Sequence, residues 1–307
     1  MSSNSTDSLI SKLLNNAAFY KEQANQENEY WGKKFSNKKQ IKIRQKDNLA
    51  GKELRVARDK MHFAGAIRRN DSAPERGLSL ACGSGRAERN ALASGICTSF
   101  HGVDVAEGAV EEARKIAHKE KLDITYTVDD LNSIELEPNS YDVVITQNCL
   151  HHVLQLEHLA EQIHGTLRPG GVLWIQDYVG ETQLQYGDKR LEIANTVLQL
   201  LPEKLRTNRA TSNIQKSVKR PEIDNISPFE AIRSAEIMPV FLKRFDILEK
   251  RETGGIMRLL LPLGAKTDYL ENDDTRAIYE LLHYLDRMLL TEGVLEPMGI
   301  QCLLRPK

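Results

Sequence analysis

The sequence predicts an α/β fold in which helices flank a doubly wound, mostly parallel sheet of seven strands. Three observations support this prediction. Short apolar runs recur from residue 77 onward, amphipathic helical segments separate them, and two closely spaced glycines follow the first run. Strands that alternate with helices build parallel sheets, and short continuous apolar runs are typical of strands that are buried on both faces.

The predicted core strands are five apolar runs rich in Val, Ile and Leu, at residues 78–82, 99–105, 124–128, 141–147 and 172–177. Two helices between them are predicted from apolar residues that share one helical face. The first face consists of Ala109, Val110, Ala113, Ile116 and Ala117, and the second of Leu156, Leu159, Ile163 and Leu167.

The alternation is interrupted after residue 177. A helix is predicted from the stripe Leu191, Ala194, Val197, Leu198 and Leu201, and a polar stretch follows at 202–225. Ser227 to Glu230 (SPFE) is predicted to start a helix that ends near Pro239, because Ser caps helices, Pro suits the first helical position and Glu completes a capping box.

The last third of the chain is expected to complete the sheet. Residues 245–250 and 299–304 are the two remaining strand candidates. Between them, residues 274–292 form an amphipathic helix closed by Gly293, which packs internally or against a second subunit.

The N-terminal residues differ from the rest, since 1–76 contain no convincing strand and Leu9–Tyr30 is compatible with helix. We therefore expect an N-terminal helical, basic extension at 1–76 and a second domain at 77–307. That domain divides into a core at 77–179, a helical insert at 180–240, and C-terminal strands and helix at 241–307.

Charge is unevenly distributed along the 307 residues. The 42 Lys+Arg and 43 Asp+Glu give a net charge of −1, which excludes a generally polycationic nucleic-acid binder. Residues 33–60, however, hold 11 Lys/Arg and 3 Asp/Glu, a local excess of +8. This basic segment is either a solvated helical face or a surface for an anionic partner, and it has too few aromatics to support base stacking.

The chain is expected to be cytoplasmic. Its four cysteines, Cys82, Cys97, Cys149 and Cys302, are isolated, so neither a disulfide framework nor a zinc knuckle is expected. The N-terminus MSSNSTDS lacks the layout of a signal peptide, and no apolar run approaches the roughly 20 residues of a membrane helix.

Candidate ligand-binding residues lie where the predicted strands end, because open α/β sheets bind ligands at the carboxyl ends of their strands. Gly83 and Gly85 follow the first strand and permit a tight turn beside a ligand. Glu88 occupies the third glycine position of a dinucleotide fingerprint, which argues against a nicotinamide dehydrogenase. Asp104, after the second strand, suits the hydroxyls of a ribose, and Asp130, after the third, could accept from an adenine amino group.

Four stretches resemble the class I S-adenosylmethionine-dependent methyltransferases: LSLACGSGR, GVDVAEGAVEEAR, TVDDLNSIELEPNSYDVVITQNCLHHV and LRPGGVLWIQDY. Together they cover about 100 residues, from Leu78 to Tyr178. The resemblance implies a Rossmann-like fold and S-adenosylmethionine as cofactor. It implies as cofactor-binding residues Ala81, Gly83, Ser84 and Gly85 in the glycine loop, Asp104 and Val105 at the ribose and adenine, Asp130 and Leu131 at the adenine edge, and Gln147 at the methionine end.

The glycine loop departs from the family pattern at two positions. The family often has an acidic residue at the position of Ser79 and a glycine at that of Ala81. The first change removes a usual partner of the cofactor ammonium, and the second adds a methyl group where backbone and ligand approach closely. Cys82 is interpreted as a packing residue rather than a nucleophile.

Catalytic candidates follow the fourth and fifth strands. His151 and His152 could supply a general base, with His152 favoured, although either could instead cap a helix or pack beneath the cofactor. Asp177 and Tyr178 could orient an acceptor hydroxyl. No metal is expected from His151, His152 and His158, because no carboxylate lies at ligand spacing on the same face.

The acceptor is expected to be chosen by the segments outside the core. DYVGETQ, LPEKLR and SPFEAIRSAEIMP are weakly similar to bacterial methyltransferases associated with sugars or surface polysaccharide. The first expectation is therefore an O-methyltransferase for a sugar, nucleotide-sugar or glycan in polysaccharide biosynthesis, with the basic segment suited to a phosphate-bearing acceptor. The alternatives are a methyltransferase for a phenolic or lipid-like small molecule or for RNA, which is the less favoured acceptor, and a non-catalytic module that binds the cofactor.

Overall fold

The computed structural model describes residues 3–36, 38–54, 63–70 and 74–307. Its centre is one seven-stranded sheet with the order β3-β2-β1-β4-β5-β7-β6. The strands are β1 (Arg76–Leu80), β2 (Ser99–Asp104), β3 (Ile124–Val128), β4 (Tyr141–Gln147), β5 (Leu167–Tyr178), β6 (Phe245–Thr253) and β7 (Gly299–Pro306). β7 alone runs opposite to the other six strands, and the strand order reverses between β1 and β4. This confirms the predicted Rossmann-like, doubly wound, mostly parallel sheet.

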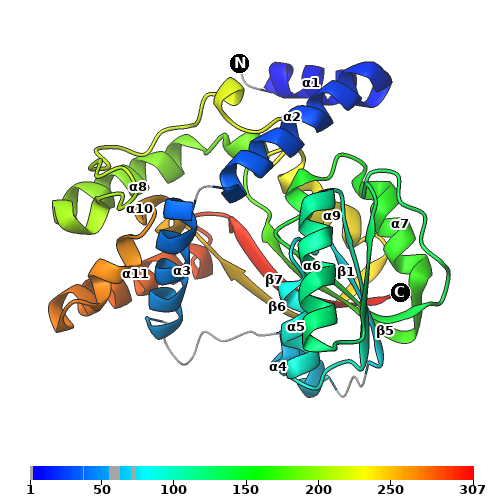
Figure 1. The fold of residues 1–307 in the computed structure, drawn as a ribbon. Coiled ribbons are helices and arrows are strands. Elements are labelled where there is room, and N and C mark those ends of the chain that lie inside the picture. The colour runs from blue at the N-terminus through cyan, green and yellow to red at the C-terminus, as the bar shows by residue number, and fades with distance from the viewer. Residues whose placement is uncertain (1–2, 37, 55–62, 71–73) are drawn as a thin grey trace.

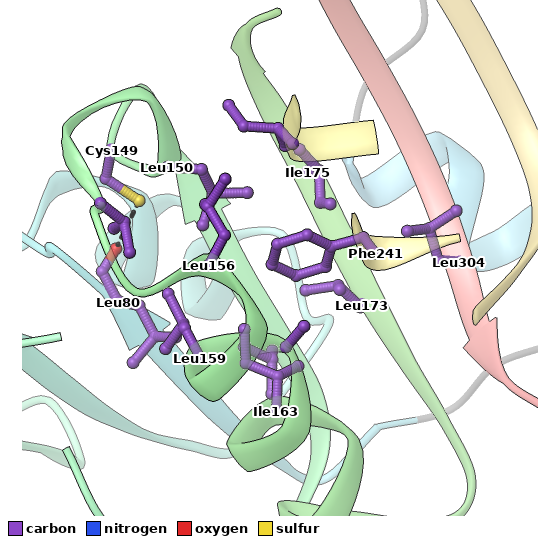
Figure 2. Close-up of a cluster of buried hydrophobic side chains, with 14 of the residues drawn as sticks. Leu80, Cys149, Leu150, Leu156, Leu159, Ile163, Leu173, Ile175, Phe241 and Leu304 are labelled. Atoms are coloured by element: carbon purple, nitrogen blue, oxygen red, sulfur yellow. Dashed lines mark hydrogen bonds between the residues drawn. The ribbon is translucent and has the colours of Figure 1, made fainter. Parts of the chain in front are cut away.

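Helices cover both faces of the sheet, because residues alternate between its faces along each buried strand. Leu173 and Ile175 of β5 face α7 (Leu156–Thr166) and α9 (Ile237–Phe241), and Figure 2 shows Phe241 among these side chains. Val172 and Trp174 lie in a second cluster with α4 (Phe63–Arg69) and α5 (Arg86–Ala93). The helix α6 (Glu107–Glu120) packs on β2 and β3.

The remaining helices lie over the carboxyl edge of the sheet and beside it (Figure 1). They are α1 (Ser3–Asn15), α2 (Ala17–Ser36), α3 (Lys38–Glu53), α8 (Asp188–Leu200), α10 (Met257–Leu260) and α11 (Asp273–Thr291). An apolar cluster of its own joins α8, α10 and α11, with Leu198, Leu260 and Leu282 among its buried members. The pair α1 and α2 packs through Leu13 and Phe19 on residues that follow β4 and β5 in the chain.

The helix predicted to start at Ser227 is wrong. Residues 228–233 form turns, and α9 begins only at Ile237 and runs through Pro239. The Ser227 hydroxyl and the Phe229 N–H donate to the carboxylate of Glu27 on α2, at 3.1 Å each. The groups expected to cap a helix here therefore bind a residue that is distant in sequence. Ala231 then adopts a φ of +53°, which ends any helical run.

Two further expectations, on the cysteines and on the basic segment 33–60, came from composition. The four cysteines are buried and form no disulfides. The basic segment 33–60 is only partly covered: its residues 38–53 form α3, while residue 37 and residues 55–60 lie outside the described residues. Within the described part of the chain, no helix combines the length and the apolar composition needed to cross a bilayer.

Candidate cofactor and catalytic site

The glycine loop leaves β1 in a left-handed conformation. Ala81, Gly83 and Gly85 have φ values of +51°, +54° and +75°. A Cβ at Gly85 would lie 2.1 Å from the Tyr126 hydroxyl, whereas a Cβ at Gly83 would meet nothing within 4 Å. The loop is therefore packed against the Tyr126 side chain at Gly85, whereas the space beside Gly83 is open. The left-handed Ala81 also explains why a glycine is favourable at that position.

The carboxylate of Asp104 closes one side of this loop. Its Oδ2 accepts from the Gly83 N–H at 2.7 Å and its Oδ1 from the Ala106 N–H at 2.9 Å. Each oxygen keeps a further lone pair for a ligand. The neighbouring Val105 is 48% exposed, and Ser84 is also exposed, so both are accessible at the sheet edge.

The Asp130 carboxylate is already engaged by the N-terminal helices. Its Oδ2 accepts from the hydroxyl of Tyr20 on α2 at 2.6 Å, and its Oδ1 from the Asn132 N–H at 2.9 Å. Burial, and then the Asp130 carboxylate, raise the pKa of Tyr20, so the hydroxyl keeps its proton. Leu131 is buried in the core cluster beneath this loop. No pattern in the sequence predicts that Tyr20 belongs to the site.

A buried acid lies under the glycine loop. Glu88 of α5 is fully buried, and burial raises its pKa, while the Ser79 hydroxyl and other groups lower it by less. Neither carboxylate oxygen makes a hydrogen bond of standard geometry. Glu88 thus places a carboxyl group near Ser79, the position where the methyltransferase family often has an acid.

His151 and Asp177 form a buried pair where β4 and β5 end. His151 Nδ1 lies 2.5 Å from Asp177 Oδ1, and the side chains are 8% and 0% exposed. The Asp177 carboxylate also accepts three backbone N–H groups, those of Cys149, Leu150 and Tyr178, at 2.9, 2.7 and 2.7 Å. These bonds hold Asp177 as an acceptor, so it fixes the orientation of the imidazole. The other ring nitrogen, His151 Nε2, faces Glu230, whose Oε1 lies 3.8 Å away.

His152 points to a different partner. Its Nδ1 lies 3.0 Å from Oε1 of Glu27, the same α2 carboxylate that binds Ser227 and Phe229. From the sequence alone, His152 is favoured over His151 as a base. In the structure His151 has the buried carboxylate that a general base of this kind needs, so we now assign that role to His151 as a proposal.

Tyr178 forms part of the wall of the site. Its hydroxyl donates to the Glu181 carbonyl at 3.2 Å, and the Arg258 guanidinium lies 4.9 Å from the ring centroid. Burial raises its pKa, so the hydroxyl stays neutral. The half-buried Gln147 ends β4 beside these groups.

A carboxylate does lie near the two histidines, which the sequence did not predict. Glu230, from the segment after β5, brings a carboxylate to the two histidines, and donor atoms of His151, His152 and Glu230 lie within 4.8 Å of one another. His158 is not part of this group, since its Nε2 lies 2.8 Å from the Ile134 carbonyl. A divalent cation could therefore compete for these donors, although Nδ1 of each histidine already faces a carboxylate.

Comparison with known proteins identifies the core. Residues 78–171 match a family model described as a methyltransferase domain. This part of the chain is a class I S-adenosylmethionine-dependent methyltransferase domain. The cofactor of this domain is S-adenosylmethionine, as the sequence resemblance implied.

The curated relatives of the methyltransferase domain differ in acceptor. They include phosphoethanolamine N-methyltransferase 2 of Caenorhabditis elegans, sterol 24-C-methyltransferase of Clavispora lusitaniae and 27-O-demethylrifamycin SV methyltransferase of Amycolatopsis mediterranei, each 32% identical. The aligned parts cover 25%, 38% and 35% of this chain, and 18%, 32% and 40% of the relatives. The match thus spans less than half the length of each relative.

Among solved structures, a methyltransferase from Mesorhizobium loti superimposes with a TM-score of 0.46 at 18% identity. The superposition covers 79% of this chain and 96% of the Mesorhizobium loti chain.

The residues present fit S-adenosylmethionine. The open space over Gly83 accepts a ligand that a side chain there would obstruct, and the Asp104 carboxylate beside it retains acceptor capacity for ribose hydroxyls. Ala81, Val105 and Gln147 lie at the same carboxyl edge. The individual binding roles of these residues are proposals.

Proposed function

We propose that the chain is an O-methyltransferase that moves a methyl group from S-adenosylmethionine to the hydroxyl of a small-molecule acceptor. The observation that supports this most is the His151–Asp177 pair, buried at the carboxyl edge of the sheet beside the proposed cofactor residues. An acceptor hydroxyl must lose a proton during transfer, and a histidine oriented by a buried carboxylate is suited to take it.

The chain's own groups have separable tasks in this proposal. When bound, the cofactor supplies an electrophilic methyl group on a positively charged sulfur. His151 Nε2 would take the proton of the acceptor hydroxyl as that oxygen accepts the methyl group. Asp177 keeps Nδ1 as the protonated nitrogen and stabilises the imidazolium, which then releases its proton to solvent.

The N-terminal helices would exclude water from the reaction. They pack on the residues that follow β4 through Leu13 and Phe19, while Tyr20 and Glu27 bind Asp130 and His152. A water-free site strengthens the electrostatic stabilisation of the imidazolium and prevents solvent from competing with the acceptor.

The nature of the acceptor is part of the same proposal. We keep a sugar, nucleotide-sugar or glycan hydroxyl as the first candidate, with a role in polysaccharide biosynthesis in the cytoplasm. None of the three relatives described above is named for a glycan acceptor, so this choice still depends on the weak sequence similarity of the segments outside the core.

The test has two stages. Calorimetry with S-adenosylmethionine, its demethylated product S-adenosylhomocysteine, and NAD as control should show binding of the two sulfur compounds alone. Acceptor panels of sugars, nucleotide-sugars and phenols are then scored by release of S-adenosylhomocysteine. Absence of binding by both sulfur compounds would overturn the proposed function, and binding without turnover on any panel would favour the non-catalytic module.

A further inference from the structure

A pocket of about 380 Å³ lies next to the His151–Asp177 pair, at the far end of the sheet edge. Its floor is the row where β5, β7 and β6 pair, with Tyr178 opposite Gly299 and Gly299 opposite Thr253. Its sides come from α3, α11 and the segment 251–266. The volume lies in the usual range for small-molecule sites of about 300–1,000 Å³.

The pocket continues directly from the proposed catalytic pair. Asp177 and Tyr178 line it, and the rings of Tyr178 and His151 are 6.3 Å apart. A ligand held here would therefore extend toward the histidine proposed as base. The inference below depends on the proposed function in this respect, because it concerns the acceptor of the same reaction.

Three cationic side chains converge on this pocket from separate parts of the chain. Arg251 comes from β6, Arg258 from α10, and Lys266 from the 3-10 helix η7 (Ala265–Leu270). An anion-binding site needs cationic side chains that meet in one cavity, and arginine and lysine both suit a phosphate or a carboxylate there.

Acidic side chains are scarce in the lining of this pocket, as far as the described residues form it. Asp177 is the one acid among the described residues that line the pocket, and its oxygens accept four hydrogen bonds from the chain. Lys266 Nζ lies 3.4 Å from Oδ2 of Asp47 on α3, so part of that charge is balanced. The Arg258 guanidinium lies over the Tyr178 ring, which carries no charge.

Neutral polar groups complete the lining. Gln301 Nε2 donates to Gln176 Oε1 at 3.0 Å across β7 and β5, and Asn148 follows β4 at the same edge. Such amides can hydrogen-bond the uncharged part of a ligand while the cations bind its anionic group.

We propose that this pocket binds the acceptor through an oxyanion group, a phosphate or a carboxylate, held by Arg251, Arg258 and Lys266. The anionic group anchors the acceptor at the β6 side of the edge and directs its hydroxyl toward His151. The acceptor class is thus a small, anionic, hydroxyl-bearing molecule.

The experiment uses the full chain saturated with S-adenosylhomocysteine and titrates inorganic phosphate in a calorimeter at constant ionic strength, with acetate in a parallel arm. The variants are Arg251→Gln and Lys266→Gln. Lys250→Gln is the matched control. Lys250 directly precedes Arg251 on β6, does not line the pocket and pairs with Glu252 at 2.8 Å. Loss of one charged hydrogen-bond donor should weaken phosphate binding about tenfold.

The proposal predicts that phosphate binds the unaltered chain and the Lys250→Gln control equally, and binds each pocket variant about tenfold more weakly. Tighter acetate than phosphate binding with the same sensitivity would assign the site to carboxylates within the same proposal. Absence of phosphate and acetate binding, or equal binding by all variants, would overturn it. Affinity for S-adenosylhomocysteine, measured on every variant, separates this failure from failure of the proposed function.

Discussion

Replacing Glu88 by glutamine is expected to change how the stability of the chain depends on pH. The side chain is fully buried beneath the glycine loop, and burial raises its pKa above the ordinary 4.5. In the unfolded chain the carboxyl group ionises near its ordinary pKa, whereas in the folded chain it stays protonated to higher pH. The folded state therefore loses stability relative to the unfolded state as the pH rises from the ordinary pKa through the raised one.

The magnitude follows from the surroundings of the carboxylate. Neither oxygen has a hydrogen bond of standard geometry, and an unsatisfied buried polar group costs about 1–3 kcal/mol, or more when it is charged. Glutamine has similar size and no charge at any pH. The difference in unfolding free energy between Glu88→Gln and the unaltered chain should thus shift in favour of the variant by about 1–3 kcal/mol as the pH rises from the ordinary pKa of the carboxyl group through the raised one.

Urea unfolding followed by far-UV circular dichroism, at several pH values, measures this difference. Glu111→Gln is the control, since Glu111 is exposed on α6 and its neutralisation should leave the pH dependence unchanged. A constant difference between the Glu88→Gln variant and the unaltered chain over the whole range would refute the reasoning. It would mean that the Glu88 carboxyl group has the same proton affinity in the folded and unfolded chains.

Three further predictions concern the site. His151→Gln should lower kcat by about 10²–10⁴-fold while His152→Gln loses less than about tenfold, in assays of S-adenosylhomocysteine release; equal losses would remove the distinction between the two histidines. Gly85→Ala should lower the melting temperature more than Gly83→Ala, because a Cβ at Gly85 would lie 2.1 Å from a tyrosine hydroxyl, whereas the methyl group at Gly83 should mainly weaken cofactor binding in calorimetry. Added Zn²⁺ should inhibit turnover, reversibly with EDTA, by binding both histidines and Glu230; undiminished inhibition of a Glu230→Gln variant would contradict this site.

Much of the fold could be predicted from hydrophobic periodicity alone. The strands expected at 124–128 and 141–147 have those bounds in the structure, because buried parallel strands are continuous apolar runs between polar ends. The helix expected at Ser227 failed for the opposite reason. Its capping signal was local and favourable, but the Glu27 carboxylate, 200 residues away in sequence, binds the same hydroxyl. Tertiary contacts override local capping in such cases.

The residues of the candidate site also fall into two groups, those that the sequence could locate and those that it could not. Gly83, Asp104 and Asp177 could be located because topology brings the carboxyl ends of parallel strands to one edge. Tyr20 and Glu230 could not, since each reaches the edge from a segment whose position depends on packing rather than on strand order. No local pattern distinguishes such a residue from an ordinary surface residue.

The contribution of the basic segment shows how composition can mislead about function. Its excess of positive charge indicated an anionic partner, yet in the described part of α3 the lysines do not line the pocket, and Lys39 donates to the Ala210 carbonyl instead. The helix contributes through its uncharged Asn48 and Gly51 and through Asp47, which positions Lys266 and accepts from its backbone N–H at 2.9 Å. The cations that line the pocket come from residues 251–266, where the sequence showed no charge cluster. Convergence of separate segments, rather than local charge density, therefore makes this pocket positive.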